Sequence, residues 1–255
     1  MGFSSRTIAL SRPPREYPSF PAWLHPARHR SGFGKDQVDL QEALGIGGTP
    51  SSEQSIGPMP AKQTIYYLTG MNGRLAEGLG GELSRRGLQL SGRELYGEFR
   101  RLTFQEQVNI VAGDLVSEHW RDDARVIANS FGAYLFLHAQ AQLPGYIGKV
   151  LLLSPIVGEF ANDELMMGFI PPRSQRLTEL IRGGEFNSPV HCEIHVGSED
   201  WQSNPNAVQQ FGDAVRASVF IVEGAGHSLP KSYVNRVLDK WLLSTDVHAR
   251  NSDKN

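Results

Sequence analysis

Three residues whose side chains suit nucleophilic catalysis each follow a strand-like segment of the sequence. Ser130 comes directly after RVIAN, Asp200 comes shortly after VHCEIHV, and His227 follows SVFIVE within the loop GAGH. A hydroxyl becomes a strong nucleophile when an imidazole accepts its proton and a carboxylate orients that imidazole. The three residue types therefore indicate acyl transfer through a serine, provided that the fold brings these loops together.

The segment ANSFG, residues 128–132, places Ser130 at a very sharp turn between a strand and a helix. Small residues at Ala128 and Gly132 let the strand and the helix pack closely behind a serine with strained backbone torsions. Ser130 is then expected to project its hydroxyl from the turn, at the positive end of the helix that begins near Phe131. The alternative is that Ser130 only caps this helix.

His227 and Asp200 are the candidates for the base and the acid. The glycines of GAGH allow His227 to approach a neighbouring strand end. A carboxylate placed after VHCEIHV can accept a hydrogen bond from the far nitrogen of the His227 ring. Glu199, directly before Asp200, is the competing acid.

From residue 64 onward, strand-like and helix-like stretches alternate along the chain. Strands are predicted over residues 64–68, 88–95, 125–130, 149–154, 190–196 and 218–223, and helices over 75–87, 103–120, 174–183 and 231–243. This alternation is typical of parallel strands joined by crossover helices, and apolar strands such as VLLL indicate helices on both faces. We therefore predict an α/β fold, a three-layer sandwich with a mostly parallel sheet of about six strands. In such sheets the loops beyond the carboxyl ends of the strands carry the reactive groups.

ANSFG resembles the nucleophile elbow of the α/β-hydrolase superfamily, Gly-x-Ser-x-Gly, with Ala128 in place of the first Gly. The chain order Ser130, Asp200, His227 is also the order of that superfamily's catalytic triad. The resemblance covers roughly residues 62–243 and implies an α/β-hydrolase fold that lacks some N-terminal strands. It also implies a small serine hydrolase or esterase without a large lid, because the segment between KVLLLS and VHCEIHV is short.

The resemblance further implies an oxyanion hole, in which backbone N–H groups stabilise the negative oxygen of the reaction intermediate. One N–H would come from Phe131, the residue after the nucleophile. The other would come from TGMNG, residues 69–73, which is similar to the superfamily's His-Gly-x-x-Gly turn with Thr69 in place of His. Position by position, Met71 becomes the second donor, with Asn72 as the alternative.

An apolar segment between KVLLLS and VHCEIHV offers a surface for the substrate. Because Met is adaptable at binding surfaces, we expect Met166 and Met167 to line a rim for an acyl chain or an aromatic group. Leu165, Phe169 and Ile170, from the same stretch ELMMGFIPP, would belong to this rim. The alternative is that the segment packs on the sheet.

The expected function is hydrolysis of a carboxylic ester or thioester with a small or medium acyl group, through an acyl-serine intermediate. This chemistry requires no cofactor and no metal. His191 and His195 share a strand face, but no third metal ligand lies near them in the sequence. The alternative is a non-catalytic protein of the same fold that binds a ligand or a partner, since a fold does not determine a function.

Composition argues against several other classes of function. The net charge is −2 with both signs spread along the chain, which gives no reason to expect nucleic acid as a partner. No apolar run approaches the roughly 20 residues that span a membrane. The single Cys192 excludes an internal disulfide, fits a small buried thiol and suits a cytoplasmic location.

The domain organisation follows from where the prolines lie. Eight of the 15 prolines fall in the first 60 residues, among Ser, Gly and Arg. Residues 1–60 are therefore expected to be irregular or disordered, with a short helix at 36–44. Residues 61–245 are expected to form the α/β-hydrolase domain, and residues 246–255 a flexible polar tail.

Overall fold

The computed structural model of this chain describes residues 64–162 and 164–243. The predictions for residues 1–60 and 246–255 therefore concern residues outside the described ranges. The strands are β1 (Thr64–Leu68), β2 (Gln89–Arg93), β3 (Arg125–Asn129), β4 (Lys149–Leu153), β5 (Phe160–Asn162), β6 (Met167–Phe169), β7 (His191–Gly197) and β8 (Ser218–Val222). The helices are α1 (Gly78–Arg85), α2 (Gly97–Arg101), α3 (Phe104–Glu118), α4 (Phe131–Gln140), α5 (Arg176–Arg182), α6 (Pro205–Val215) and α7 (Lys231–Leu243).

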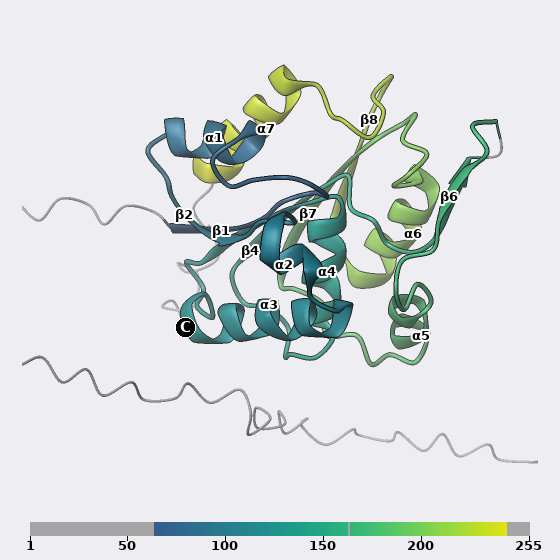
Figure 1. Ribbon diagram of the computed structural model, residues 1–255, viewed down its shortest axis with the longest axis horizontal. Helices are drawn as coiled ribbons and strands as arrows, with labels where there is room; N and C mark the ends of the chain where they lie inside the picture. The colour runs from purple at the N-terminus through teal and green to yellow at the C-terminus, as the bar shows by residue number, and fades with distance from the viewer. Residues whose placement is uncertain (1–63, 163, 244–255) are drawn as a thin grey trace, which may run out of the picture.

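The main sheet has six strands in the order β2-β1-β3-β4-β7-β8, and every neighbouring pair is parallel. Helices α1 and α7 cover one face, and α3, α4 and α6 lie on the other (Figure 1). Successive residues of β1 point to opposite faces: Ile65 and Tyr67 pack with α1 and α7, whereas Tyr66 and Leu68 pack with α3 and α4. The predicted three-layer α/β sandwich is confirmed.

Local sequence signals set where two of the helices begin. Thr103 accepts a hydrogen bond from the backbone N–H of Glu106, and the Glu106 carboxylate accepts one from the backbone N–H of Thr103, so a capping box starts α3. The side chain of Asn204 caps α6, which has Pro205 at its first position. Left-handed backbone at Arg216, with φ 59°, ends α6. These boundaries direct the chain back into β8.

Four elements differ from the predicted ones. Helix α1 begins at Gly78 instead of residue 75, because the Leu75 N–H donates to the Glu94 carboxylate at 2.7 Å and holds the preceding residues in a turn. The helix α2 was not predicted, since five residues are too few to show a helical period. Strands β5 and β6, also not predicted, form a separate two-stranded antiparallel sheet that projects from the body of the molecule (Figure 1).

The parallel sheet brings four loops to one edge. The segments after β1, β3, β7 and β8 all leave the carboxyl ends of their strands, so they meet at the same side of the sheet. These segments contain the residues that the sequence singled out for catalysis. Among residues 64–162 and 164–243, no helix is long and apolar enough to cross a membrane.

Candidate active site

Ser130 occupies a strained turn between β3 and α4. Its backbone has φ 52° and ψ −118°, a conformation that residues other than glycine rarely adopt. The Ser130 N–H donates to the Leu153 carbonyl at 2.9 Å, which anchors the turn to the neighbouring strand. Its side chain makes no capping hydrogen bond to α4. The alternative that Ser130 serves as a helix cap is therefore wrong, and the sharp turn predicted from ANSFG is present.

Gly132 allows the first turn of α4 to approach β1 very closely. A Cβ atom at this position would lie 2.3 Å from the Thr69 carbonyl oxygen and 2.5 Å from the Leu68 carbonyl oxygen. Both contacts are far below van der Waals distance and involve backbone atoms, which have little freedom to move. The glycine of ANSFG is therefore required by the packing of the helix against the strand beside it.

Replacing Gly132 with alanine is expected to lower the free energy of unfolding by about 1–3 kcal/mol, the usual cost of forcing an extra carbon into a packed site. Urea denaturation measures this change. The control is Gly113→Ala on α3, where an added Cβ meets no neighbouring atom within 4 Å. That variant should gain about 0.5–1 kcal/mol from helix propensity. Similar losses in the two variants would contradict the proposed close approach.

The three candidate catalytic side chains form one hydrogen-bonded chain. The Ser130 Oγ lies 2.8 Å from His227 Nε2, and His227 Nδ1 lies 2.9 Å from Asp200 Oδ2 and 3.0 Å from Asp200 Oδ1. Because an ionised carboxylate only accepts hydrogen bonds, Nδ1 carries the ring proton and Nε2 is free to accept the hydroxyl proton. The structure thus brings together the three residues that the sequence placed on separate loops.

Asp200 is held in place by backbone donors. Its side chain is buried, and its Oδ1 accepts hydrogen bonds from the N–H groups of Gln202 at 2.9 Å and Ser203 at 2.8 Å. These bonds satisfy the carboxylate without a counter-charge and fix its orientation toward His227. Glu199 is exposed, so the competing acid lies on the wrong side of the loop.

The loop that carries His227 is fixed against the end of β7. A Cβ atom on Gly197 would lie 2.1 Å from the Ala225 carbonyl oxygen, so only glycine allows the two segments to touch. The Gly224 N–H donates to Ser198 Oγ at 2.9 Å, and the Glu199 N–H donates to the Ala225 carbonyl at 2.9 Å. Gly197 therefore serves close packing, whereas Gly224 has a positive φ of 69° that favours glycine, and a Cβ on Gly224 or Gly226 would meet nothing within 4 Å. These contacts hold the loop and its imidazole in position.

Ser203 belongs to the site but was not identified in the sequence. Its Oγ donates to the Ser154 carbonyl at 2.7 Å and lies 3.4 Å from His227 Nδ1. Ser203 therefore links the loop after β7 to the end of β4, and its N–H also supports Asp200. A serine three residues after an acid is too common a pattern to indicate this role from sequence alone.

The loop TGMNG lies beside the nucleophile and forms a tight turn. Thr69 is buried, and its Oγ1 accepts a hydrogen bond from the Leu95 N–H at 2.9 Å and donates one to the Gly73 carbonyl at 3.2 Å. The Gly73 N–H donates to the Gly70 carbonyl at 2.9 Å and closes the turn. Thr69 thus anchors the loop in the position that the superfamily's motif gives to His.

The turn distinguishes the two candidate oxyanion donors. The Asn72 N–H already donates to the Leu95 carbonyl at 3.0 Å, so the alternative donor is not free to bind an oxyanion. The Met71 N–H makes no hydrogen bond within the described part of the chain. Phe131 is the first residue of α4, where an N–H has no partner inside the helix. Met71 and Phe131 can therefore both donate to a ligand at Ser130.

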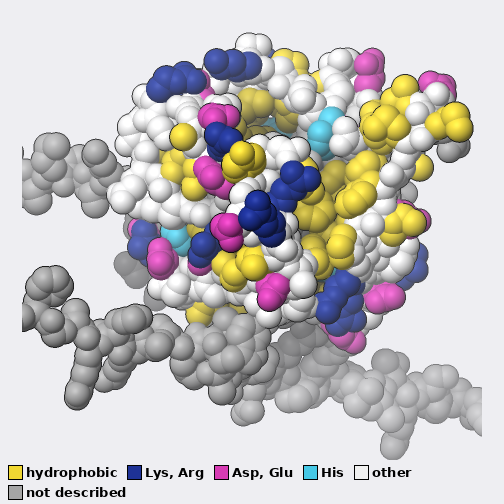
Figure 2. Space-filling model, in the orientation of Figure 1, with side chains coloured by type: hydrophobic (Ala, Val, Ile, Leu, Met, Phe, Trp, Pro, Cys, Tyr) yellow, Lys and Arg dark blue, Asp and Glu magenta, His cyan; other side chains and the backbone are white. Residues whose placement is uncertain are grey.

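Aromatic rings form a wall beside Ser130. The Phe131 ring lies 6.2 Å from that of Phe169 on β6, and Phe160 on β5 lies 5.6 Å from both Phe169 and Trp201. The Phe104 ring of α3 completes this aromatic wall at 6.3 Å from Phe131. Hydrophobic side chains gather along the same side of the β5–β6 hairpin (Figure 2).

The two methionines of the predicted rim have different positions in this hairpin. Met167 is half-exposed and shares a face of β6 with Phe169, two residues away. Met166 lies at the turn, with φ 48° and 93% of its surface exposed, so it stands apart from the aromatic wall. The alternative that the whole segment packs on the main sheet is wrong, because its apolar side chains are exposed and its strands pair in a separate sheet.

Three other reactive side chains lie on β7. His195 is buried, its Nδ1 bonds to the Tyr233 hydroxyl at 2.8 Å, and its Nε2 bonds to Glu193 at 2.7 Å. His191 is exposed. Burial raises the pKa of the Cys192 thiol to about 12, so a reactive thiolate is disfavoured near neutral pH. Within the described ranges, no three His, Cys, Asp or Glu side chains are placed to hold a metal ion.

Known proteins resemble this chain in structure and not in sequence. No family model matches the sequence, and no curated protein matches it either. The structure is similar to the ydeN gene product of B. subtilis, with a TM-score of 0.51 and 15% identity, over 72% of this chain and 100% of that one. It is also similar to esterase PE8, with a TM-score of 0.51 and 14% identity, over 71% and 92% of the two chains. For a putative hydrolase from Bacillus subtilis, the TM-score is 0.50 and the identity 11%, over 72% and 85%. At these identities the likeness establishes a shared fold.

Proposed function

The chain has the α/β-hydrolase fold, and on that basis we propose that it is a serine hydrolase that cleaves carboxylic esters or thioesters of small or medium acyl groups. The observation that carries this proposal is the hydrogen-bonded chain from Ser130 through His227 to Asp200, with distances of 2.8 Å and 2.9 Å. This arrangement provides a nucleophile, a general base and a group that orients the base.

The reaction follows from this geometry. His227 Nε2 takes the proton of Ser130, whose Oγ attacks the carbonyl carbon of the substrate. The N–H groups of Phe131 and Met71 stabilise the negative charge that develops on the carbonyl oxygen. His227 then gives its proton to the leaving oxygen or sulfur, and the bond to the leaving group breaks. A water molecule, deprotonated by His227, then attacks the acyl-serine. As the bond between the acyl carbon and Oγ breaks, His227 gives its proton to Oγ, which releases the carboxylic acid and restores Ser130.

The strained backbone of Ser130 favours catalysis over simple ligand binding. A residue held at φ 52° and ψ −118° costs of order 1–3 kcal/mol, which the rest of the fold has to offset. A protein that only binds a ligand would gain nothing from this strain. A nucleophile benefits, because the turn exposes its hydroxyl beside the backbone N–H groups of Phe131 and Met71.

The aromatic wall supports an acyl group with several methylene groups. Each methylene that leaves water for an apolar surface contributes about 0.8 kcal/mol, which corresponds to roughly a fourfold gain in kcat/KM. The exposed Phe169 offers such a surface next to Phe131. An acyl chain bound there would have its carbonyl carbon near Ser130.

A series of p-nitrophenyl esters from acetate to octanoate tests the proposed function. We expect kcat/KM to rise with chain length and then level off, with acyl-thioesters cleaved and p-nitroanilides cleaved poorly. Phe169→Ala should flatten the dependence on chain length, because it removes the contact between the acyl chain and the wall. Phe220→Ala is the control, since Phe220 lies on β8, where its ring stacks on His195.

Absence of hydrolysis for every ester and thioester, in protein shown to be folded, would contradict the proposed function. It would favour the alternative, a non-catalytic protein that binds a ligand or a partner through the same fold. An unchanged chain-length dependence in Phe169→Ala would contradict only the acyl site at the aromatic wall.

A further inference from the structure

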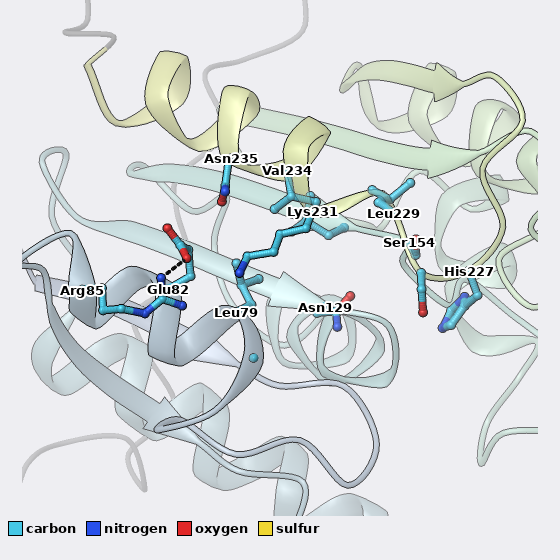
Figure 3. A pocket seen from close by; sticks show the side chains of 13 residues that line it. Leu79, Glu82, Arg85, Asn129, Ser154, His227, Leu229, Lys231, Val234 and Asn235 are labelled. Atoms are coloured by element: carbon cyan, nitrogen blue, oxygen red, sulfur yellow. Dashed lines mark hydrogen bonds and ion pairs between the residues drawn. The ribbon is translucent and has the colours of Figure 1, made fainter.

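A cleft of about 640 Å³ opens between α1 and α7, with His227 at one end (Figure 3). It lies on the face of the sheet opposite to α3 and α4, above the carboxyl ends of β3 and β4. The reaction proposed above assigns no role to this space. Residues from five segments line it: Gly78, Leu79, Glu82, Arg85, Asn129, Leu153, Ser154, His227, Ser228, Leu229, Lys231, Val234 and Asn235.

Ser154 presents an unsatisfied hydroxyl to this cleft. The residue is 1% exposed, and its Oγ has no hydrogen-bond partner among residues 64–162 and 164–243. Most buried polar groups in proteins are hydrogen-bonded, so an unpaired hydroxyl that lines a cleft points to a ligand that supplies the missing acceptor or donor. The side chain lies near His227 (Figure 3), which places this ligand close to the reacting atoms.

Asn129 adds a second polar group at the same end of the cleft. It directly precedes the nucleophile, and by the alternation along β3 its side chain lies on the same face as Ile127, toward α1 and α7. The amide of Asn129 makes no hydrogen bond within the described ranges. The floor of the cleft thus offers the Asn129 amide and the Ser154 hydroxyl to a ligand.

Lys231 gives the cleft an uncompensated positive charge. Its side chain extends from the start of α7 across the cleft toward Leu79 (Figure 3). It makes no ion pair with any carboxylate of the described residues. Glu82, the acidic residue in the lining, lies 2.5 Å from Arg85 and 3.4 Å from Arg86, so its charge is already neutralised. A ligand anion would therefore find its counter-charge at Lys231.

We propose that this cleft binds the leaving group of the substrate, and that the leaving group is an aliphatic alcohol ending in a carboxylate. The inference rests on the proposed function. In that reaction His227 donates the proton taken from Ser130 to the leaving oxygen as the acyl C–O bond breaks, so the leaving oxygen lies next to His227. The leaving group therefore extends from the reacting carbon past His227 into the cleft. The acyl group extends in the opposite direction, toward the aromatic wall. The aliphatic stem contacts the apolar residues of the lining, Leu79, Leu153, Leu229 and Val234.

Two esters that differ only at the far end of the leaving group test this assignment. The substrates are 6-(butyryloxy)hexanoate and 6-(butyryloxy)hexanamide, and released butyrate is quantified by chromatography. We expect kcat/KM to be about tenfold higher for the carboxylate than for the amide, as expected for one charge-assisted contact. Lys231→Met should bring this ratio close to one. Lys240→Met, which removes a lysine from the last turn of the same helix, should leave the ratio unchanged.

Binding of the alcohol product separates the cleft from the reaction itself. Titration of Ser130→Ala protein with 6-hydroxyhexanoate, followed by NMR, should give a Kd about tenfold weaker when Lys231→Met is added. It should be about three- to tenfold weaker when Ser154→Ala is added, because one neutral hydrogen bond is lost.

Each outcome supports or overturns one proposal. Hydrolysis of both esters at equal rates by the wild type would overturn the leaving-group assignment and leave the hydrolase proposal intact. If neither ester is hydrolysed while the p-nitrophenyl esters are, the leaving-group assignment is overturned and the hydrolase proposal stands. If neither these esters nor any ester or thioester of the chain-length series is hydrolysed, the hydrolase proposal fails. The titration then decides the cleft, and equal binding by the Ser130→Ala protein with and without Lys231→Met overturns it.

Discussion

Replacement of Ser130 by alanine is expected to lower ester turnover by about 10⁴- to 10⁶-fold while leaving the protein folded, because the variant lacks the atom that attacks the substrate. Ser130 has no side-chain role in capping α4, so removal of its hydroxyl should cost little stability. Turnover is measured with the best ester of the chain-length series, and the fold is checked by circular dichroism and urea denaturation.

A fluorophosphonate probe adds a direct test of the same residue. The probe should label the wild type covalently at Ser130 and spare Ser130→Ala. Ser117→Ala is the matched control, since Ser117 is exposed on α3 and its loss should change neither turnover nor labelling. Full labelling of Ser130→Ala, or turnover within tenfold of the wild type, would place the nucleophile elsewhere.

Asp200→Asn is expected to lower kcat by about 10⁴-fold with little change in the backbone. The asparagine can still accept hydrogen bonds from the N–H groups of Gln202 and Ser203 through its carbonyl oxygen. Its NH₂ group would then face His227 Nδ1 and favour the tautomer that carries a proton on Nε2. That tautomer cannot accept the proton of Ser130, so the nucleophile is no longer activated.

Glu199→Gln is the matched control for the acid. Glu199 is exposed and directly precedes Asp200, so the variant changes the same charge in the same loop without contact with His227. Its kcat should stay within about twofold of the wild type. A loss in Glu199→Gln comparable to that in Asp200→Asn would show that the loop tolerates no change and would leave the role of Asp200 without support.

The sequence was informative where several independent patterns agreed. The alternation of strand-like and helix-like stretches predicted a parallel sheet, and a parallel sheet brings the ends of β3, β7 and β8 to one edge. Ser130, Asp200 and His227 could therefore be predicted to meet before any distance was known. The small residues of ANSFG also predicted the sharp turn from the local sequence alone, because the close contact at Gly132 excludes a larger side chain.

The remaining features depend on contacts between distant segments. The Asn72 N–H donates to the carbonyl of Leu95, which lies in the loop after β2. The sequence does not reveal this contact, so it could not exclude Asn72 as the oxyanion donor. Strands β5 and β6 have three residues each, too few to show an alternating pattern. The position of Met166 at the hairpin turn follows from that missed pairing, and Ser203 was missed because its partners lie on β4 and on the His227 loop.

Ser130 and His227, the proposed nucleophile and base, are 97 residues apart in the chain, on segments that follow β3 and β8. In the sheet, β4 and β7 lie between these strands, so the pair forms only after three strand pairings are complete. Such long-range pairings form slowly compared with local helices. Recovery of hydrolytic activity during refolding would therefore report when β8, the last strand of the sheet, has paired. A chain that ends before β8 would contain the turn that carries Ser130 but would lack His227, and it should be inactive.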